Sequence, residues 1–353
     1  MQPDDAVTVP TDQLLALVER VFEAVGSPPG EAATVAAELA AADRMGLHSH
    51  GCARVGEYVA AVDDGRVTPG APVTVAHETS ATALVDGGGN FGQVVAEVAL
   101  EVAIAKARET GTATVVTRRS HHVGRVGALM ERAAEHDLIA LATVAVGLPG
   151  LVAPWGAAEG LLGTNPFAYG VPYADGEVVT DFATSTSAEG AVRLAHEAGA
   201  TLPEGVLVDA AGEPTTDPGQ LFAQPRGALL PFGGPHGHKG YALNILPELT
   251  AAALAGYGAE DPARPSNCLL LFVVDPGAFL PVERFKALAG TSVRMIKGAR
   301  PRQGEQVLLP GEREAASAAA AGDATPLARA TLAEIEQVAQ RLGVAGLDGA
   351  AAR

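Results

Sequence analysis

Two histidines lie where a predicted strand would deliver side chains into a crevice. His121 and His122 follow the apolar, β-branched run 113–116, which predicts a buried strand, and precede a segment of helical character at 127–135. Imidazole is the side chain best suited to exchanging a proton near neutral pH, so the segment is a candidate acid–base site. The alternative is structural: Ser120 would cap the helix and the histidines would satisfy local hydrogen bonds.

A second segment offers a histidine together with a cation and a phenol. Ser49 is the predicted N-cap of a helix over 50–62. Along it His50, Arg54 and Tyr58 recur every four residues and therefore share one face. This stripe could be a solvated face or an anion site with a proton donor beside it, because arginine can bind a carboxylate through two hydrogen bonds. The arginine and the positive helix end should both lower the pKa of His50.

The bulk composition is that of an acidic globular protein. The 353 residues, 48% hydrophobic and 18% charged, can form a large core in two or three substructures. The formal net charge of -17 argues against a general nucleic-acid binder and against a polybasic membrane anchor. The two cysteines form no CxxC pair and the N-terminus shows no signal pattern, which fits a cytoplasmic protein. The uncharged stretch 138–158 is broken by glycines and prolines, so it predicts a buried strand at 138–146 and not a transmembrane helix.

Periodicity and turn signals predict helices and strands along the whole chain. Thr11 is the expected cap of the first helix, and Pro247 should kink the helix that contains it. The other expected elements are helices over 11–24, 31–44, 188–198, 241–255, 282–297 and 327–342 and strands at 72–76, 83–86, 177–181 and 268–274, and the run 307–312 is expected to end a further strand in a turn.

A glycine-rich turn at 87–92 matches G-x-G-x-x-G between a predicted strand and a predicted helix that ends at Gly111. Asn90 and Gln93 have the spacing of a capping box. The next strand ends at Arg118-Arg119, where a dinucleotide-binding fold can carry an arginine for a 2′-phosphate. The residues alone therefore suggest a Rossmann-type NADP site, although such turns have many other uses.

Two further stretches have features of phosphate sites. The hydroxyl-rich run 184–187 follows a predicted strand and offers caps and exposed amides. Lys239, one of only four lysines, lies between a histidine and a glycine at the start of an apolar helix. A surface lysine needs no such setting, so we expect Lys239 to reach a cofactor phosphate or carboxamide.

Eight motifs follow one another between about residue 10 and residue 345. They are Ser49-His50-Gly51 with Arg54 and Tyr58, 86–93, Ser120-x-His122-x-Gly124, 152–156, 163–166, 181–185, 238–241 and 310–314. In this order they resemble the malate/L-lactate dehydrogenases of the second, non-Rossmann type. Relatives in that family include ureidoglycolate dehydrogenase, sulfolactate dehydrogenase, 2,3-diketogulonate reductase and piperideine-2-carboxylate reductase. Each motif is modest alone, but eight in order are specific.

The resemblance implies an α/β fold that is not Rossmann, with a mixed sheet and a helical N-terminal segment. It also implies a homodimer with the active site near the subunit interface. We expect residues 1–75 to carry substrate-site residues and to pack with the C-terminal part, 76–265 to form a central α/β cofactor-binding domain, and 266–353 to close the site. The implied cofactor is NAD or NADP, held not by the turn at 87–92 but by His122, Asp181, Ala183, Thr184, Ser185, Lys239, Gly240, Pro310, Gly311 and Glu312.

The resemblance places the proton donor on His50, with His122 in the same pocket, and Ser49, Arg54 and Tyr58 along the substrate site. The chemistry agrees, because reducing a 2-oxo acid or a cyclic 2-imino acid needs a hydride, a proton and a cation for the carboxylate. Either histidine could give the proton, and Arg54 could hold the carboxylate. We favour His50 as the donor and His122 as the residue that orients the carbonyl or imine.

The chain also departs from the family. His121-His122-Val123 stands where Asn, His and Phe are usual, which changes the pocket wall and puts the substrate in question more than the reaction class. Two other functions remain open. The histidine pairs at 48/50, 121/122 and 236/238 could ligate a metal in a hydrolase or lyase, but H-E-x-x-H is absent and no carboxylate completes a set. A non-catalytic homologue is disfavoured by the joint presence of His50, Arg54, His122 and Lys239. We therefore expect a small-molecule carboxylate substrate, no metal, no nucleic acid and no membrane partner.

Overall fold

A seven-stranded mixed sheet forms the centre of the protein. The computed structural model describes residues 6–147, 150–257 and 267–347. The strand order is β2-β3-β4-β11-β5-β6-β7, and among these strands only β3 and β4 pair in parallel. Their bounds are β2 Thr74–Glu78, β3 Thr82–Asp86, β4 Thr112–Arg118, β11 Cys268–Val274, β5 Ile139–Ala145, β6 Phe167–Tyr173 and β7 Gly176–Phe182. The expected mixed α/β, non-Rossmann fold is confirmed.

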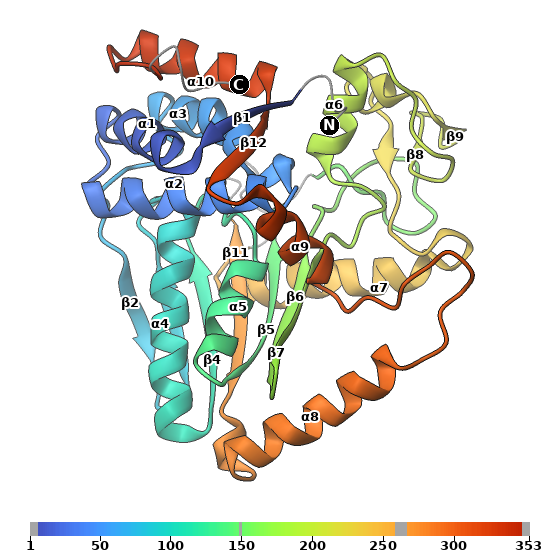
Figure 1. Cartoon of the computed structure of the whole chain (residues 1–353). Helices are drawn as coiled ribbons and strands as arrows, with labels where there is room; N and C mark the ends of the chain where they lie inside the picture. The colour runs from blue at the N-terminus through green and yellow to red at the C-terminus, as the bar shows by residue number, and fades with distance from the viewer. Residues whose placement is uncertain (1–5, 148–149, 258–266, 348–353) are drawn as a thin grey trace.

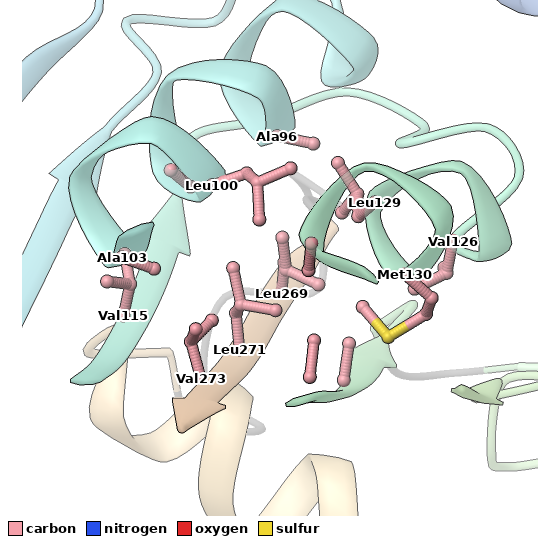
Figure 2. Close-up of a cluster of buried hydrophobic side chains, with 14 of the residues drawn as sticks. Ala96, Leu100, Ala103, Val115, Val126, Leu129, Met130, Leu269, Leu271 and Val273 are labelled. Atoms are coloured by element: carbon pink, nitrogen blue, oxygen red, sulfur yellow. The ribbon is translucent and has the colours of Figure 1, made fainter. Parts of the chain in front are cut away.

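Helices pack on both faces of this sheet, although part of the second face remains open (Figure 1). On one face α4 (Gly92–Thr110) and α5 (Gly127–Glu135) bury the main core. Figure 2 shows Leu100 of α4, Met130 of α5 and Leu271 of β11 in this core, where each buried side chain contributes about 1.5–3 kcal/mol. Alternate residues of β11, including Leu270, pack on the other face against the turn Glu248–Ala252. Burial on both faces explains the apolar run over 268–271, whereas Phe272 is 43% exposed.

The two ends of the described chain meet. Strand β1 (Ala6–Pro10) pairs antiparallel with β12 (Ala324–Ala328), and neither strand was expected from the sequence. A second core joins the N-terminal helices to the last helix through residues such as Phe22 and Ile335. The helices concerned are α1 Thr11–Ala24, α2 Pro29–Arg44, α3 Val55–Asp63 and α10 Arg329–Arg341.

The remaining elements lie at the margins of the sheet (Figure 1). They are α6 Glu189–Glu197, β8 Leu207–Val208, β9 Pro214–Thr215, β10 Ala228–Leu229, α7 His238–Pro247, α8 Val282–Lys297 and α9 Glu312–Ala321. Strands β8, β9 and β10 form a small sheet of their own. No helix in the described part of the chain combines the length and the apolar composition that crossing a bilayer requires.

Several local predictions were wrong. Thr11 does not cap α1, because its hydroxyl bonds to that of Thr325 at 3.0 Å. The capping box at Asn90 does not form, because the Asn90 side-chain oxygen accepts from the Phe91 N–H at 2.7 Å and the Gln93 side chain donates to Tyr58. Residues 307–309 form no strand. At Pro247 the helix α7 continues as a π-helical turn, a local adjustment that accommodates the missing backbone donor.

Candidate active site

The segment before α3 is a pair of tight turns and not the expected helical start. Short 3-10 turns cover His48–His50 and Cys52–Arg54, and α3 begins only at Val55. The buried carboxylate of Asp43 holds them: it accepts from the Cys52 N–H at 2.6 Å and lies 2.8 Å from His48 Nδ1. A Cβ at Gly51 would lie 2.3 Å from this carboxylate, so the turn requires glycine. Ser49 is therefore not a helix cap. The prediction that His50, Arg54 and Tyr58 lie along one face of a single regular helix was wrong.

The turns nevertheless bring the predicted side chains together. Tyr58 Oη lies 2.6 Å from His122 Nδ1 and 3.0 Å from Gln93 Nε2. The rings of His50 and His122 stack with centroids 5.6 Å apart and planes inclined by 30°. Ser49 Oγ lies 3.1 Å from His50 Nδ1. Side chains from the turns, from α3, from α4 and from the loop after β4 thus converge on one cluster.

The glycine-rich turn at 87–92 serves this cluster. A Cβ on Gly92 would lie 2.2 Å from the carbonyl oxygen of His122, so glycine allows the histidine loop to pass against the start of α4. Asp86, which precedes the turn, accepts hydrogen bonds from Arg118 at 3.0 Å and from Arg119 at 2.7 Å. The Rossmann interpretation of the turn is therefore wrong, because its glycines admit protein backbone.

Burial and nearby cations keep His50 neutral. Its pKa falls to about 4, first because burial removes water from the charged form, then because of Arg54 and Arg125. The direction agrees with the sequence-based prediction. The cause differs, since no long helix begins at His50 and desolvation takes the place of the expected helix end.

The neighbouring rings are shifted in the same sense. The pKa of His122 lies well below its usual range because of burial and then the charge of Arg54. The pKa of His121 falls to about 4, again mainly through burial, and its ring packs edge-on against Tyr58 at 5.5 Å. Burial raises the pKa of Tyr58, which therefore remains a phenol. At neutral pH the cluster is a set of uncharged imidazoles beside cations.

Arg54 is anchored but not fully used. Its Nε donates to the Ser49 carbonyl oxygen at 2.8 Å, and its Nη1 donates to Glu57 at 2.6 Å. Among the described residues Nη2 makes no hydrogen bond, and the side chain is 18% exposed. An arginine oriented from one side in this way can bind an incoming carboxylate with its remaining donor.

Sequence reasoning missed a second cation, Arg125. It is 8% exposed and donates to both oxygens of Glu131 at 2.7 Å. A Cβ on Gly127 would lie 3.1 Å from Arg125 Nη1 and 3.2 Å from Asp181 Cβ, so Arg125 lies near Asp181, and its charge also acts on His50. Asp181 itself accepts from the Gly127 N–H at 2.8 Å. The arginine one residue beyond Ser120-x-His122-x-Gly124 was the available signal.

The hydroxyl-rich run 184–187 makes hydrogen bonds within the protein. The N–H groups of Thr184 and Thr186 already donate to the carbonyl oxygens of Thr164 and Leu230, so these two amides are not free for a phosphate as expected. The buried Thr184 hydroxyl donates to the Asn165 carbonyl oxygen at 2.8 Å. Ala183 adjoins it, and Ser185 Oγ donates to the Ser187 carbonyl oxygen at 2.7 Å.

The four lysines differ in their partners. Three bind carboxylates at 2.7–2.8 Å, in the pairs Lys106–Glu78, Lys286–Asp137 and Lys297–Glu312. Lys239 is exposed and makes no ion pair or hydrogen bond with any described residue. Its neighbour Gly240 packs so closely that a Cβ would lie 2.2 Å from the Phe232 carbonyl oxygen.

The Pro310-Gly311-Glu312 turn lies at the start of α9. Gly311 has a φ of +86°, and a Cβ there would lie 3.0 Å from the Val179 carbonyl oxygen of β7. Glu312 is held by Lys297 and by the Leu309 N–H at 2.9 Å. In the described residues neither this turn nor Lys239 makes a hydrogen bond or ion pair with the histidine cluster. Within the same residues, no group of three or more histidines, cysteines and carboxylates could hold a metal ion.

Comparison with known proteins agrees with this architecture. Residues 9–336 match the family described as malate/L-lactate dehydrogenase, and the chain belongs to that family. It is 36% identical to an L-lactate dehydrogenase of Cupriavidus necator, over 93% of this chain and 96% of that one. It is 39% identical to a Δ1-pyrroline-2-carboxylate/Δ1-piperideine-2-carboxylate reductase of Pseudomonas putida, over 77% and 80% of the two chains.

A solved structure extends the likeness to the fold. The malate dehydrogenase of Pyrococcus horikoshii superposes with a TM-score of 0.88 at 31% identity, covering 98% of both chains. The protein is accordingly an oxidoreductase of the dehydrogenase and reductase class.

Proposed function

We propose that the protein transfers a hydride between NAD or NADP and a small 2-hydroxy/2-oxo acid or a cyclic 2-imino acid. His50 exchanges the proton and Arg54 binds the substrate carboxylate. The observation that carries this proposal is the stacked pair of neutral imidazoles, 5.6 Å apart, beside a partly engaged arginine. It unites in one place the acid–base group and the cation that this chemistry needs.

His50 can act in both directions. Ser49 Oγ is hydrogen-bonded to His50 Nδ1, and Nε2 has no hydrogen-bond partner among the described residues. In oxidation the neutral ring accepts the proton of the substrate hydroxyl. In reduction the protonated ring donates it, and the substrate assists, because a carboxylate on Arg54 cancels the cation that lowers the pKa of His50.

The residues present also fit a dinucleotide. Lys239 is exposed, has no ion-pair partner among the described residues and lies in the first turn of α7, a location that favours a phosphate. We assign Lys239, Gly240, His122, Asp181, Ala183, Thr184, Ser185 and the turn Pro310-Gly311-Glu312 to cofactor binding. The bound nicotinamide supplies or accepts the hydride.

We also propose that the protein is a cytoplasmic homodimer. An apolar groove on the open face of the sheet is lined by residues that include Leu141, Leu246 and Phe272. Phe272 is 43% exposed, and Leu249 beside the groove is 70% exposed. Exposed apolar surface of this kind is typical of an interface. Sedimentation of the purified protein should give twice the chain mass of 35.6 kDa, and a monomer would refute the homodimer.

A reductase screen tests the function directly. Small 2-oxo acids and cyclic 2-imino acids are each offered with NADH and with NADPH, and the nicotinamide absorbance is followed. At least one pair should turn over, and His50→Gln, as the matched control, should turn it over on the order of a hundredfold more slowly. A protein inactive with every pair, and not stabilised by any of the dinucleotides in a thermal titration, would refute the proposal.

A further inference from the structure

A chain of hydrogen bonds runs from α4 to the active-site pair. Gln93 Nε2 lies 3.0 Å from Tyr58 Oη, which lies 2.6 Å from His122 Nδ1. Tyr58 is fully buried and Gln93 is 4% exposed, so water does not compete for these bonds. The donor and acceptor capacities of the three side chains fix the direction of these hydrogen bonds.

An amide nitrogen can only donate. Tyr58 Oη therefore accepts from Gln93, and its single proton is directed to His122 Nδ1. The phenol keeps that proton because burial raises its pKa. His122 Nδ1 must then be an acceptor, and a neutral imidazole that accepts at Nδ1 carries its proton on Nε2.

The glutamine leaves most of its hydrogen-bonding capacity unused. Gln93 Oε1 is buried and has no hydrogen-bond partner among the described residues. A buried carbonyl left unpaired is destabilising, and an apolar side chain of the same size would avoid that cost. The residue therefore calls for an explanation other than stability, and the donor that it presents to Tyr58 provides one.

We propose that Gln93 is a positioning residue that holds His122 in the Nε2–H form, so that His122 only donates a hydrogen bond to the substrate oxygen or nitrogen. Proton exchange is thereby left to His50. The inference rests on the proposed function for the identity of the ligand. His122 Nε2 is available, since it makes no hydrogen bond to any described residue.

Nitrogen NMR of histidine-labelled protein tests the tautomer without any turnover. The His122 signals are assigned by their loss in His122→Gln. In the wild type at pH 7 we expect Nε2 to carry the proton and Nδ1 to show the shift of an acceptor nitrogen. An Nδ1–H form would overturn the inference.

Gln93→Glu tests the donor and acceptor order along the Gln93–Tyr58–His122 hydrogen bonds (the relay) and hardly changes the shape of the side chain. At pH 9 the introduced carboxylate can only accept, so Tyr58 should donate its hydrogen bond to the carboxylate and accept one from His122 Nδ1–H. The tautomer of His122 should switch, and kcat/KM should fall about a hundredfold or more, the lower range for a lost catalytic hydrogen-bond donor. An unchanged tautomer in this variant would contradict the mechanism.

A double-mutant cycle tests whether Gln93 acts on His122 through Tyr58 and not through a general change in the structure. In a Tyr58→Phe background the relay is broken, so adding Gln93→Glu should leave the His122 signals where Tyr58→Phe alone puts them. If Gln93→Glu shifts them equally in both backgrounds, Gln93 does not act through Tyr58. Because the tautomer is measured without substrate, a protein inactive in every assay would refute the proposed function and not this assignment.

Discussion

The low pKa of His50 predicts how the rates of the oxidative and the reductive reaction each depend on pH. For a 2-oxo acid, each reduction consumes one proton, so thermodynamics requires the ratio of oxidative to reductive kcat/KM to rise tenfold per pH unit. The pKa of the catalytic acid–base group determines whether the oxidative or the reductive kcat/KM changes with pH. With a pKa of about 4, His50 is neutral throughout the range from pH 5 to pH 8.

The oxidative kcat/KM should therefore be flat over this range, since the base is already in its active form. The reductive kcat/KM should fall about tenfold per pH unit, or about a thousandfold in total, because it follows the shrinking protonated fraction. An unperturbed histidine near pH 6.5 would give the opposite pattern below that pH. The reductive kcat, which reports the substrate complex, should break at a higher pH because the bound carboxylate offsets Arg54.

The assay is initial velocity in both directions with one 2-oxo acid and its 2-hydroxy acid, in buffers of constant ionic strength. A 2-oxo acid is chosen because a cyclic imine titrates by itself. If the reductive kcat/KM were flat between pH 5 and pH 6 while the oxidative value rose, the low pKa of His50 would be wrong. His50→Gln should abolish the break in the reductive kcat.

Three further predictions follow from the same geometry. His50→Gln should lower kcat on the order of a hundredfold, whereas His122→Gln should raise KM more than it lowers kcat; steady-state kinetics with the reverse ranking would give the donor role to His122. Lys239→Ala should weaken dinucleotide binding while Lys106→Ala does not, as measured by calorimetry, and an unchanged affinity would refute the assignment. His50 and His121 have pKa values of about 4 in the folded protein, below the value near 6.5 in the unfolded chain. Below pH 6.5 the unfolded state therefore binds more protons, so the free energy of unfolding should fall as the pH drops from 6.5 to 4. Thermal melts should show this loss, and a His50→Gln variant that loses as much as the wild type would contradict the account.

The fold was predictable where patterns are long. The run at 268–274 and the helix at 282–297 were recognised, because an unbroken apolar strand and a long periodic helix are strong local signals. The pairing of β1 with β12 was not, since two five-residue strands more than 300 positions apart carry no local signal of their partnership.

The site was predicted as a set of residues but not as a geometry. His50, Arg54, Tyr58 and His122 do converge, yet they do so through turns held by Asp43. A buried carboxylate nine positions away cannot be assigned to this role from spacing. Gln93 was assigned to a cap because its distance from Asn90 fitted one, whereas the competing partner, Tyr58, lies 35 positions away in the chain.

The position of β11 has a consequence for the biogenesis of this protein. It lies between β4 and β5 in the sheet, although those strands are made more than 120 residues earlier. Until residue 274 leaves the ribosome, β4 and β5 expose unpaired edges toward a gap, and exposed edges recruit other chains. Fragments that stop before β11 should therefore aggregate, and the protein should depend on chaperones most strongly in the interval before that strand is synthesised.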